Sequence, residues 1–141
     1  MNPAPSVHGL RVALTVADLD AALRLFRDGF GLPVVQQWTV GEGRGIVLAA
    51  GPETTIELLN TTEATRVDGI EAGGHPAGAV RLAFAVADVA SVAGAVLAAG
   101  GKPVHAAVPT PWGDYNQRLA TPDGLHITLY QPGAVEPSQN T

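Results

Sequence analysis

Residues 11–18 read Arg-Val-Ala-Leu-Thr-Val-Ala-Asp, and residues 81–88 read Arg-Leu-Ala-Phe-Ala-Val-Ala-Asp. The likeness continues further along the chain, so that 8 of 24 ungapped positions are identical between 11–34 and 81–104. Repetition at a fixed offset indicates a duplicated structural unit. We therefore predict two similar modules, each of which opens with an arginine on its first strand.

The composition indicates a folded, weakly charged chain. Of the 141 residues, 46% are hydrophobic and only 15% are charged, which favours a buried core and an oligomer that covers part of the surface. The formal net charge of −5 argues against binding to nucleic acid or to anionic membranes. Cysteine is absent, which excludes disulfides and thiolate metal sites. No apolar run approaches the roughly 20 residues of a membrane span, so we expect a cytoplasmic protein.

Alternation and capping residues predict the elements of the first module. In residues 10–17, bulky apolar residues alternate with small or polar ones, as in a half-buried strand. Asp18 then stands at a helix N-cap position, apolar residues follow at helical spacing, and Gly29 and Gly31 end the run. Turn-forming residues separate three further predicted strands, at 33–40, 46–50 and 54–60.

The same order recurs after a connecting segment. Residues 62–78 show no sustained periodicity, and we interpret them as a linker that borders a site. A second set of elements follows: a strand at 79–87, a helix capped by Asp88, and strands from 103, at 114–121 and at 124–131. The predicted fold class is α+β, with two βαβββ modules, 7–61 and 79–132, in one domain at 7–132, and a disordered tail at 133–141.

Strand parity places a set of polar residues on one face of the sheet. The bulky residues of each first strand must pack under the helices, so the residues that alternate with them face the opposite, concave side. The small residues Ala13 and Ala83 on that side leave room for a ligand. Applied to the first and last strands of both modules, the rule predicts a concave surface that contains Arg11, Glu57, Arg81, His126, Thr128 and Tyr130.

Several motifs together resemble the vicinal oxygen chelate superfamily, which includes glyoxalase I, extradiol dioxygenases, and fosfomycin and bleomycin resistance proteins. The resemblance covers about residues 7–132 and implies paired βαβββ modules that form an open, barrel-like cup, usually within a homodimer. The motifs are Val16-Ala-Asp-Leu-Asp, Phe26-Arg-Asp-Gly-Phe-Gly-Leu-Pro33, Thr54-Thr-Ile-Glu-Leu58, and Pro111-Trp-Gly-Asp-Tyr-Asn-Gln-Arg118 leading into Pro122-Asp-Gly124.

The resemblance also implies where a metal ion would be held. Metal-dependent members carry His or Glu early in the first strand and inside the last strand of each module, and these positions here hold Arg11, Glu57, Arg81 and Thr128. A guanidinium stays protonated and cannot coordinate a cation, so only Glu57 is a normal ligand, short of the three that a catalytic site needs. We therefore predict no metal and no cofactor, as in the metal-free antibiotic-binding members.

Two interpretations of the arginines and Glu57 remain open. In the first, they form a structural ion pair that fills a vestigial site. In the second, the surplus positive charge receives an anionic, phenolic or carbonyl oxygen of a ligand. We favour the second, because the small neighbours of the arginines do not fill the cup.

Aromatic residues and one histidine complete the predicted site. Trp38 and Trp112, the two tryptophans of the chain, together with Tyr115 and Tyr130, are candidates for flat walls on which a planar ligand stacks. Core packing or dimer contacts would explain each of them singly. His126 is the candidate catalytic residue, either as a hydrogen-bonding group or as a general base.

Three other polar residues are given lesser roles. His8 has the opposite parity to Arg11 and is expected outside the cup. Asp114 and Arg118 precede the last hairpin, and we interpret them mainly as fixing that turn.

The function that the sequence favours is metal-independent binding of a small, partly planar molecule, with a small-molecule ligand and a second copy of the chain as partners. One alternative is a metal-independent isomerase or natural-product tailoring enzyme, in which His126 moves protons while the arginines hold an enolate-like oxygen. The other is a glyoxalase- or dioxygenase-like metalloenzyme with unusual ligands. The sequence leaves binding and catalysis open.

Overall fold

The repeated sequence forms two modules with the same order of elements, and the predicted N-caps Asp18 and Asp88 each accept a hydrogen bond from the first turn of the following helix. The first module contains β1 (Val7–Thr15), α1 (Leu19–Leu23) continued by a π-helical segment (Arg24–Gly29), β2 (Val34–Val40), β3 (Gly43–Ala49) and β4 (Thr54–Leu59). Helix α2 (Thr61–Ala72) follows. The second module contains β5 (Val80–Val86), α3 (Val89–Ala98), β6 (Lys102–Pro103), β7 (Val108–Pro109), β8 (Tyr115–Ala120) and β9 (His126–Gln131).

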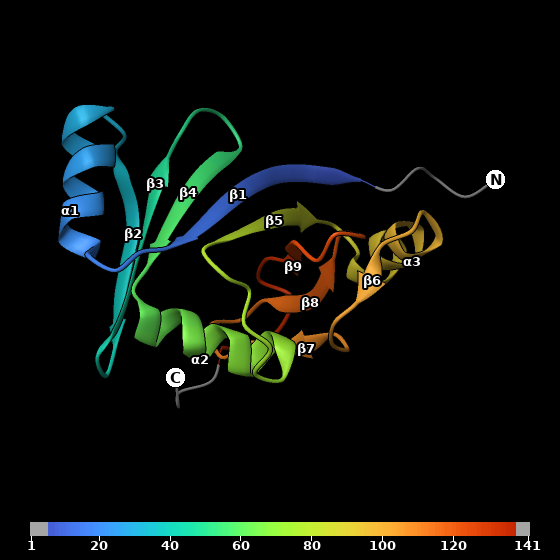
Figure 1. The fold of residues 1–141 in the computed structure, drawn as a ribbon. Helices are drawn as coiled ribbons and strands as arrows, with labels where there is room; N and C mark the ends of the chain where they lie inside the picture. The colour runs from blue at the N-terminus through green and yellow to red at the C-terminus, as the bar shows by residue number, and fades with distance from the viewer. Residues whose placement is uncertain (1–5, 138–141) are drawn as a thin grey trace.

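The first strands of the two modules, β1 with Arg11 and β5 with Arg81, pair at the centre of one curved sheet and join the modules (Figure 1). The computed structural model describes residues 6–137, whose strands form a nine-stranded sheet in the order β2-β3-β4-β1-β5-β9-β8-β6, with β7 beside β8. Each first strand lies parallel to the last strand of its module, β1 to β4 and β5 to β9. The prediction of an α+β fold with an open, curved sheet is confirmed.

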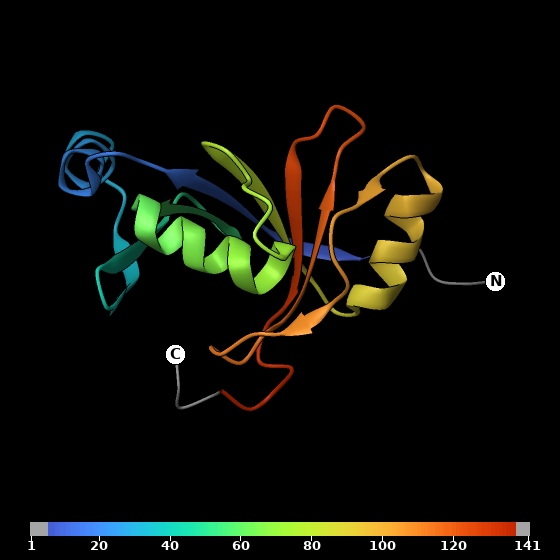
Figure 2. The same cartoon turned by 60° about the horizontal axis from the view of Figure 1, so that its bottom comes forward.

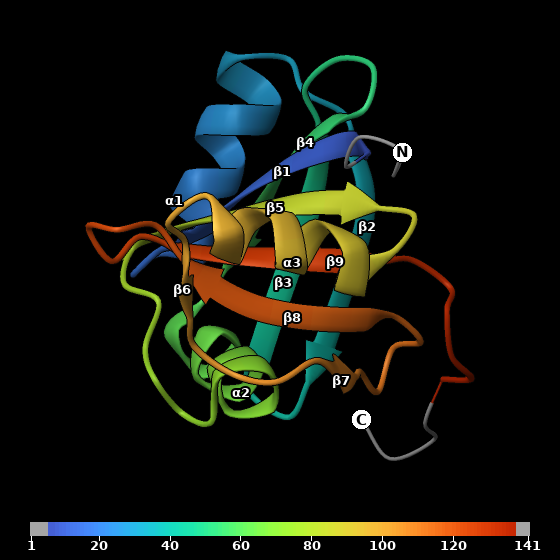
Figure 3. The ribbon, with the colours of Figure 1, turned by 90° about the vertical axis from the view of Figure 1, so that its right-hand side faces the viewer.

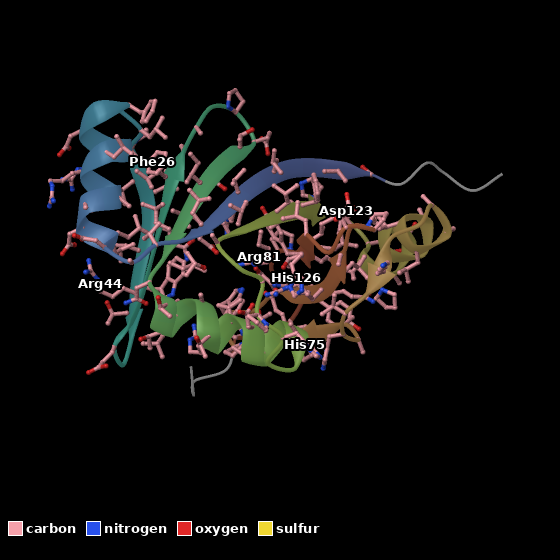
Figure 4. All side chains as sticks on the ribbon, viewed as in Figure 1. Phe26, Arg44, His75, Arg81, Asp123 and His126 are labelled. Atoms are coloured by element: carbon pink, nitrogen blue, oxygen red, sulfur yellow. The ribbon has the colours of Figure 1, made fainter. Side chains whose placement is uncertain are left out.

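Each module has its own apolar core beneath its helix, as the strand parity predicts. Figure 3 shows α3 lying over β8 and β9. In the first module, α1 and the π-helical segment cover the sheet, and Phe26 points toward the strands (Figure 4). The buried members of the two cores are Leu19, Ile46, Leu48 and Leu58 in the first module and Val86, Val89, Val92, Ala93, Leu119 and Leu129 in the second.

Helix α2 corrects the prediction that residues 62–78 form an irregular linker. The side chain of Asn60 accepts a hydrogen bond from the Glu63 amide and caps the helix, and Gly73 ends it in the left-handed conformation at φ 60°. The helix lies between the two modules (Figure 2) and packs against β3, β4 and β8. Its inward residues are mainly acidic rather than apolar, so the usual pattern of an amphipathic helix is absent.

Two further details differ from the sequence prediction. The strand predicted from residue 103 is divided into the short strands β6 and β7. The predicted disordered tail is ordered at its start, where the Gly133 amide donates to Asp114 Oδ1 and the Val135 amide donates to Gly113 O, both at 3.1 Å. The rest of that prediction, at 138–141, lies outside the described residues. Among residues 6–137, no helix is long and apolar enough to cross a membrane.

Candidate ligand-binding site

The concave side of the sheet and α2 enclose a cavity of about 680 Å³. Both modules and the connecting helix contribute to its walls, and its size is typical of small-molecule sites. Of the small residues predicted on that side, Ala83 lines the cavity and Ala13 does not, and Ala85 lines it as well. The predicted site residues that line the cavity are Arg11, Trp38, Glu57, Arg81, Trp112, Thr128 and Tyr130.

Glu57 lies between the two arginines of the repeat. Its carboxylate accepts a hydrogen bond from Arg11 Nη1 at 3.1 Å and another from Arg81 Nη2 at 3.5 Å. The sheet register produces this arrangement, because Ala13 pairs with Glu57 on one side and with Arg81 on the other. Arg11 Nε also donates to the Thr55 hydroxyl at 3.1 Å. The structure thus brings together three of the four positions at which the superfamily resemblance implies metal ligands.

The fourth position, Thr128, holds Arg81 from its other side. Arg81 Nη1 donates to the Thr128 hydroxyl at 2.9 Å, and that hydroxyl donates to Glu71 Oε1 at 2.7 Å. Thr128 and Glu71 are both buried, so water does not compete for these bonds. Sequence reasoning found Arg81 and Thr128 but missed Glu71, because Glu71 lies on the unpredicted helix α2.

Arg118 continues the network behind the cavity and corrects a second prediction. Its side chain is fully buried and donates to Glu71 through Nε and Nη2, at 3.2 and 3.0 Å. Nη1 donates to Asp68 at 2.9 Å. Arg118 therefore joins β8 to α2 rather than fixing the turn before the last hairpin. Burying these charges costs free energy, and the hydrogen bonds from the Arg118 guanidinium to the Glu71 and Asp68 carboxylates offset that cost.

This network removes the surplus positive charge that the sequence predicted. Burial raises the pKa of Glu71, but the guanidiniums of Arg81 and Arg118 and hydrogen bonds from Asn116 and Thr128 outweigh that effect, so its pKa is lowered. Glu71 is therefore ionised at neutral pH. Among the residues that line the cavity, five carboxylates accompany three guanidiniums. The arginines consequently present no uncompensated charge to an anionic ligand oxygen.

The residues at the four metal positions do not fit a metal ion. Arg11 and Arg81 occupy two of them and bond to the carboxylate at the third, while the hydroxyl at the fourth serves Arg81 and Glu71. Guanidinium groups have no lone pair to offer a cation. Within residues 6–137, no group of three His, Asp or Glu side chains is arranged to hold a metal ion.

Trp38 is an aromatic residue of the cavity wall. Its indole ring is held by a hydrogen bond at its edge and by close packing against a glycine. Its indole Nε1 donates to Glu63 Oε2 at 2.6 Å. Its ring lies against Gly45 on the neighbouring strand, where a β-carbon would overlap the ring. This close approach explains the glycine at 45 without any appeal to turn conformation.

Trp112 is linked to the same carboxylate through Arg66. Arg66 donates to both oxygens of Glu63, at 2.8 and 2.7 Å, and its guanidinium stacks over the Trp112 ring with 5.6 Å to the centroid. The indole Nε1 of Trp112 donates to Asp114 Oδ2 at 3.2 Å. One face of Trp112 is therefore occupied by Arg66, and 37% of the residue remains exposed.

The two tyrosines lie on opposite faces of the sheet. Tyr130 lines the cavity with the Arg11 guanidinium 5.4 Å from its ring centroid. Tyr115 instead packs against the core under α3. Tyr115 does not line this cavity, because it neighbours Asn116, which faces the cavity, and side chains alternate along β8. That Tyr115 contacts a ligand stays a prediction.

The two histidines also differ from their predicted positions. His126 shares a face with Thr128 and is drawn near Arg81 in Figure 4, but it does not line the cavity, and its Nδ1 lies 3.0 Å from Arg118 Nη1. His8 does line the cavity, contrary to parity, because the pairing of β1 with β5 shifts between Val7 and Gly9.

His126 is expected to make stability depend on pH. Burial lowers its pKa, and the Arg118 guanidinium lowers it further, so the unfolded chain takes up a proton more readily than the native protein. The unfolding free energy should fall as pH drops from about 7 through the reference value of about 6.5. In urea titrations at several pH values, His126→Gln should flatten this fall, whereas His8→Gln, at an exposed position, should not. An unchanged slope in His126→Gln would contradict the assignment.

Sequence reasoning missed or undervalued other polar residues of the cavity besides Glu71. Glu63 and Arg66 lie on α2, and the sequence signal for that helix was the Asn60 cap followed three residues later by Glu63. Asp114 and Asn116 lie at the start of β8, where alternation with Arg118 would have placed both on the concave face.

The chain belongs to the Glyoxalase/Bleomycin resistance protein/Dioxygenase superfamily, whose family model matches residues 10–129. Comparison with curated proteins gives no significant match. The mixed α+β fold with its curved, open sheet agrees with this membership.

Several solved structures share the fold. Methylmalonyl-CoA epimerase from Mycobacterium tuberculosis is 23% identical with a TM-score of 0.66, and the alignment covers 94% of this chain and 93% of that one. A variant of Streptomyces coelicolor methylmalonyl-CoA epimerase in complex with 2-nitronate-propionyl-CoA is 20% identical, with a TM-score of 0.63 and coverage of 91% and 98%. A superfamily member from Vibrio splendidus 12B01 is 16% identical, with a TM-score of 0.59 and coverage of 86% and 97%.

Proposed function

We propose that this protein binds a small, partly planar molecule in the cavity between its modules without the aid of a metal ion, as the metal-free antibiotic-binding members of the superfamily do. The observation that carries the proposal is the replacement of the metal positions by the Arg11–Glu57–Arg81–Thr128 cluster, while the cavity of about 680 Å³ is retained. A vestigial site filled by side chains would leave little space.

The walls of the cavity support a planar ligand. Tyr130 lines it from β9 and Trp112 from the loop before β8, and each has an arginine on one face of its ring. Aromatic faces with a polar edge bind flat molecules by stacking and by hydrogen bonding at the rim. The ion-paired arginines hold these rings in place and need not touch the ligand.

Trp112→Ala is expected to weaken ligand binding about tenfold or more, because it removes an aromatic wall. Native mass spectrometry of purified protein would reveal a co-purified molecule, and quenching of the two tryptophans would report titration with planar natural products. Leu125→Ala is the matched control, because Leu125 is also 37% exposed but does not line the cavity. Equal affinities in the two variants would remove Trp112 from the site.

A second candidate function is a metal-independent isomerase. Two observations favour it: solved neighbours include methylmalonyl-CoA epimerases, and burial raises the pKa of the cavity carboxylate Asp114. A raised pKa suits a group that exchanges protons. Incubation with methylmalonyl-CoA in D2O with a chelator should then give deuterium exchange that is lost in Asp114→Asn. His126→Ala tests the role predicted for that residue from the sequence.

We also infer a homodimer from the apolar surface at one end of the sheet. Leu25, Phe30 and Val35 are 55%, 67% and 59% exposed, and they lie at or before β2, the edge strand whose outer side has no neighbouring strand among the described residues. Contact with a second copy would cover both the apolar side chains and the strand edge. Light scattering of the native protein should give twice the chain mass, and Phe30→Glu should shift it to the monomer value.

A further inference from the structure

One nitrogen of the Arg11 guanidinium is open to a molecule in the cavity. Arg11 Nε donates to the Thr55 hydroxyl and Nη1 donates to Glu57, both at 3.1 Å, and these two bonds fix the orientation of the group. Nη2 has no hydrogen-bond partner among residues 6–137, yet it is not a buried atom, because Asn116 Oδ1 is the only buried unpartnered side-chain atom in that range. The Arg11 side chain is 26% exposed and lines the cavity. Its two remaining N–H groups are therefore available to a ligand.

The Tyr130 hydroxyl is a second open donor beside Arg11. The Arg11 guanidinium lies 5.4 Å from the centroid of the Tyr130 ring, and both residues line the cavity. The Tyr130 oxygen likewise has no partner in the described part of the chain and is not a buried atom. Burial raises the pKa of this phenol, so it keeps its proton at neutral pH and can donate a hydrogen bond.

The surface of the sheet between these donors carries only small residues. Arg11 pairs with Ala83 on β5. Two residues further along that strand, Ala85 pairs with Gly9 on one side and with Tyr130 on the other. Gly9, Ala83 and Ala85, which we call the floor, all line the cavity. The α-carbons of Ala83 and Ala85 are roughly 6–7 Å apart by strand geometry, so the floor is wide enough for a flat ring to lie close to the backbone.

Negative charge is disfavoured at this place. Burial raises the pKa of Tyr130, and the net effect stays upward although the Arg11 guanidinium lowers it. Three carboxylates contribute to the rise, those of Glu57, Asp114 and Glu53. A ligand carboxylate or phenolate beside the phenol would meet the same burial and the same acidic neighbours. An uncharged oxygen avoids both penalties and still accepts hydrogen bonds from the two donors.

We propose that Arg11 Nη2 and the Tyr130 hydroxyl together bind one uncharged carbonyl oxygen of a planar ligand whose ring rests on the floor. This inference rests on the proposed binding function and names its ligand class, conjugated carbonyl compounds such as aryl ketones, aryl amides and quinones. A carbonyl oxygen has two lone pairs near the plane of its substituents, so it accepts from both donors at once. Conjugation keeps the carbonyl close to the plane of the ring, and the ligand can therefore lie flat while both bonds form.

Three naphthalenes of nearly equal shape test this preference on the native protein. They are 2-acetonaphthone, 2-isopropenylnaphthalene, in which C=CH2 replaces the C=O group, and 2-naphthoate, measured by equilibrium dialysis at pH 7. We expect the ketone to bind at least tenfold more tightly than either of the others, because it alone offers an acceptor without negative charge. An alkene that binds as tightly as the ketone, or a naphthoate that binds as tightly or more so, overturns this inference and leaves the proposed binding function standing.

Tyr130→Phe locates the subsite, because it removes the hydroxyl and keeps the ring. Ketone binding should fall about tenfold, while binding of the alkene should stay within about twofold and serves as the control within the same variant. Ketone affinity that is unchanged in Tyr130→Phe overturns the inference.

Arg11→Lys tests the other donor, because it keeps a positive charge beside Glu57 but lacks the planar fork that bonds to Thr55, Glu57 and the ligand together. Ketone binding should again fall about tenfold. Arg24→Lys is the matched control, at an exposed position that does not line the cavity. Equal ketone affinity in the two lysine variants overturns the inference. Binding of none of the three probes by the native protein would contradict the proposed function itself and this inference with it.

Discussion

Replacing Arg118 by methionine is expected to lower the unfolding free energy by about 3–5 kcal/mol, because it leaves buried carboxylates without their cation. The Arg118 side chain is fully buried and holds Glu71 and Asp68 through three of its nitrogens. Arg81 reaches Glu71 only through the Thr128 hydroxyl, so it does not replace the lost contact. Helix α2 would lose the hydrogen bonds that join it to Arg118 on β8, and α2 forms part of the cavity wall.

Urea unfolding followed by circular dichroism measures this loss. Arg44→Met is the matched control: Arg44 pairs with Asp20 on the surface at 3.3 Å, and a pair of this kind contributes at most about 1 kcal/mol. The double variant Glu71→Gln/Arg118→Met should recover part of the loss, because one of the two stranded carboxylates is then neutral. A loss as small as that of Arg44→Met would show that the buried network does not hold α2.

The fold was predictable because its signals are local. Period-two alternation at 10–17 and 79–87 is confirmed by β1 and β5, and the carboxylates of Asp18 and Asp88 cap the helices as expected. The repeat then determined the architecture, since one module predicts the other. The concave face followed from parity alone. Of the residues that parity placed there, Arg11, Glu57, Arg81, Thr128 and Tyr130 line the cavity, whereas His126 does not.

Helix α2 was not predictable from apolar periodicity, because most of the residues that it buries at helical spacing are acidic rather than apolar. Its buried positions include Glu63, Val67, Asp68 and Glu71, which recur at helical spacing, but three of the four are carboxylates. Such residues normally face solvent and are buried only when partners are available. Arg118, the cationic partner of Glu71 and Asp68, lies 47 and 50 residues away from them in sequence, and no local pattern reveals it.

The charge of the site was mispredicted for the same reason. Strand parity placed two guanidiniums beside one carboxylate, which suggested a preference for anions. The acidic residues of α2 and of the loop before β8 reverse that balance. Alternation along the strands therefore predicts which strand residues face the site. The net charge of the site also depends on every other segment that covers the strands.

Replacing both repeat arginines by histidine is expected to create a metal site where the native protein has an ion-pair cluster. In Arg11→His/Arg81→His, two imidazoles would join Glu57, which gives the three protein ligands that suffice for Zn²⁺ or Co²⁺. The positions are those at which the superfamily resemblance implies metal ligands. Loss of both guanidiniums also leaves Glu57 and Glu71 with excess negative charge, and this favours a bound cation further.

The double variant should bind one Co²⁺ per chain with micromolar or tighter affinity, giving visible absorption bands, while the native protein should bind none. Because the metal binds only the folded state, 100 times its Kd should raise the unfolding free energy by about 2.7 kcal/mol. Arg24→His/Arg27→His adds the same two imidazoles at exposed positions and is the control. Introducing Glu57→Gln into the double variant should abolish binding. If the double variant takes up no more Co²⁺ than this control, the three side chains do not converge as the sheet register indicates, and the argument that arginines displaced a metal from this cup fails.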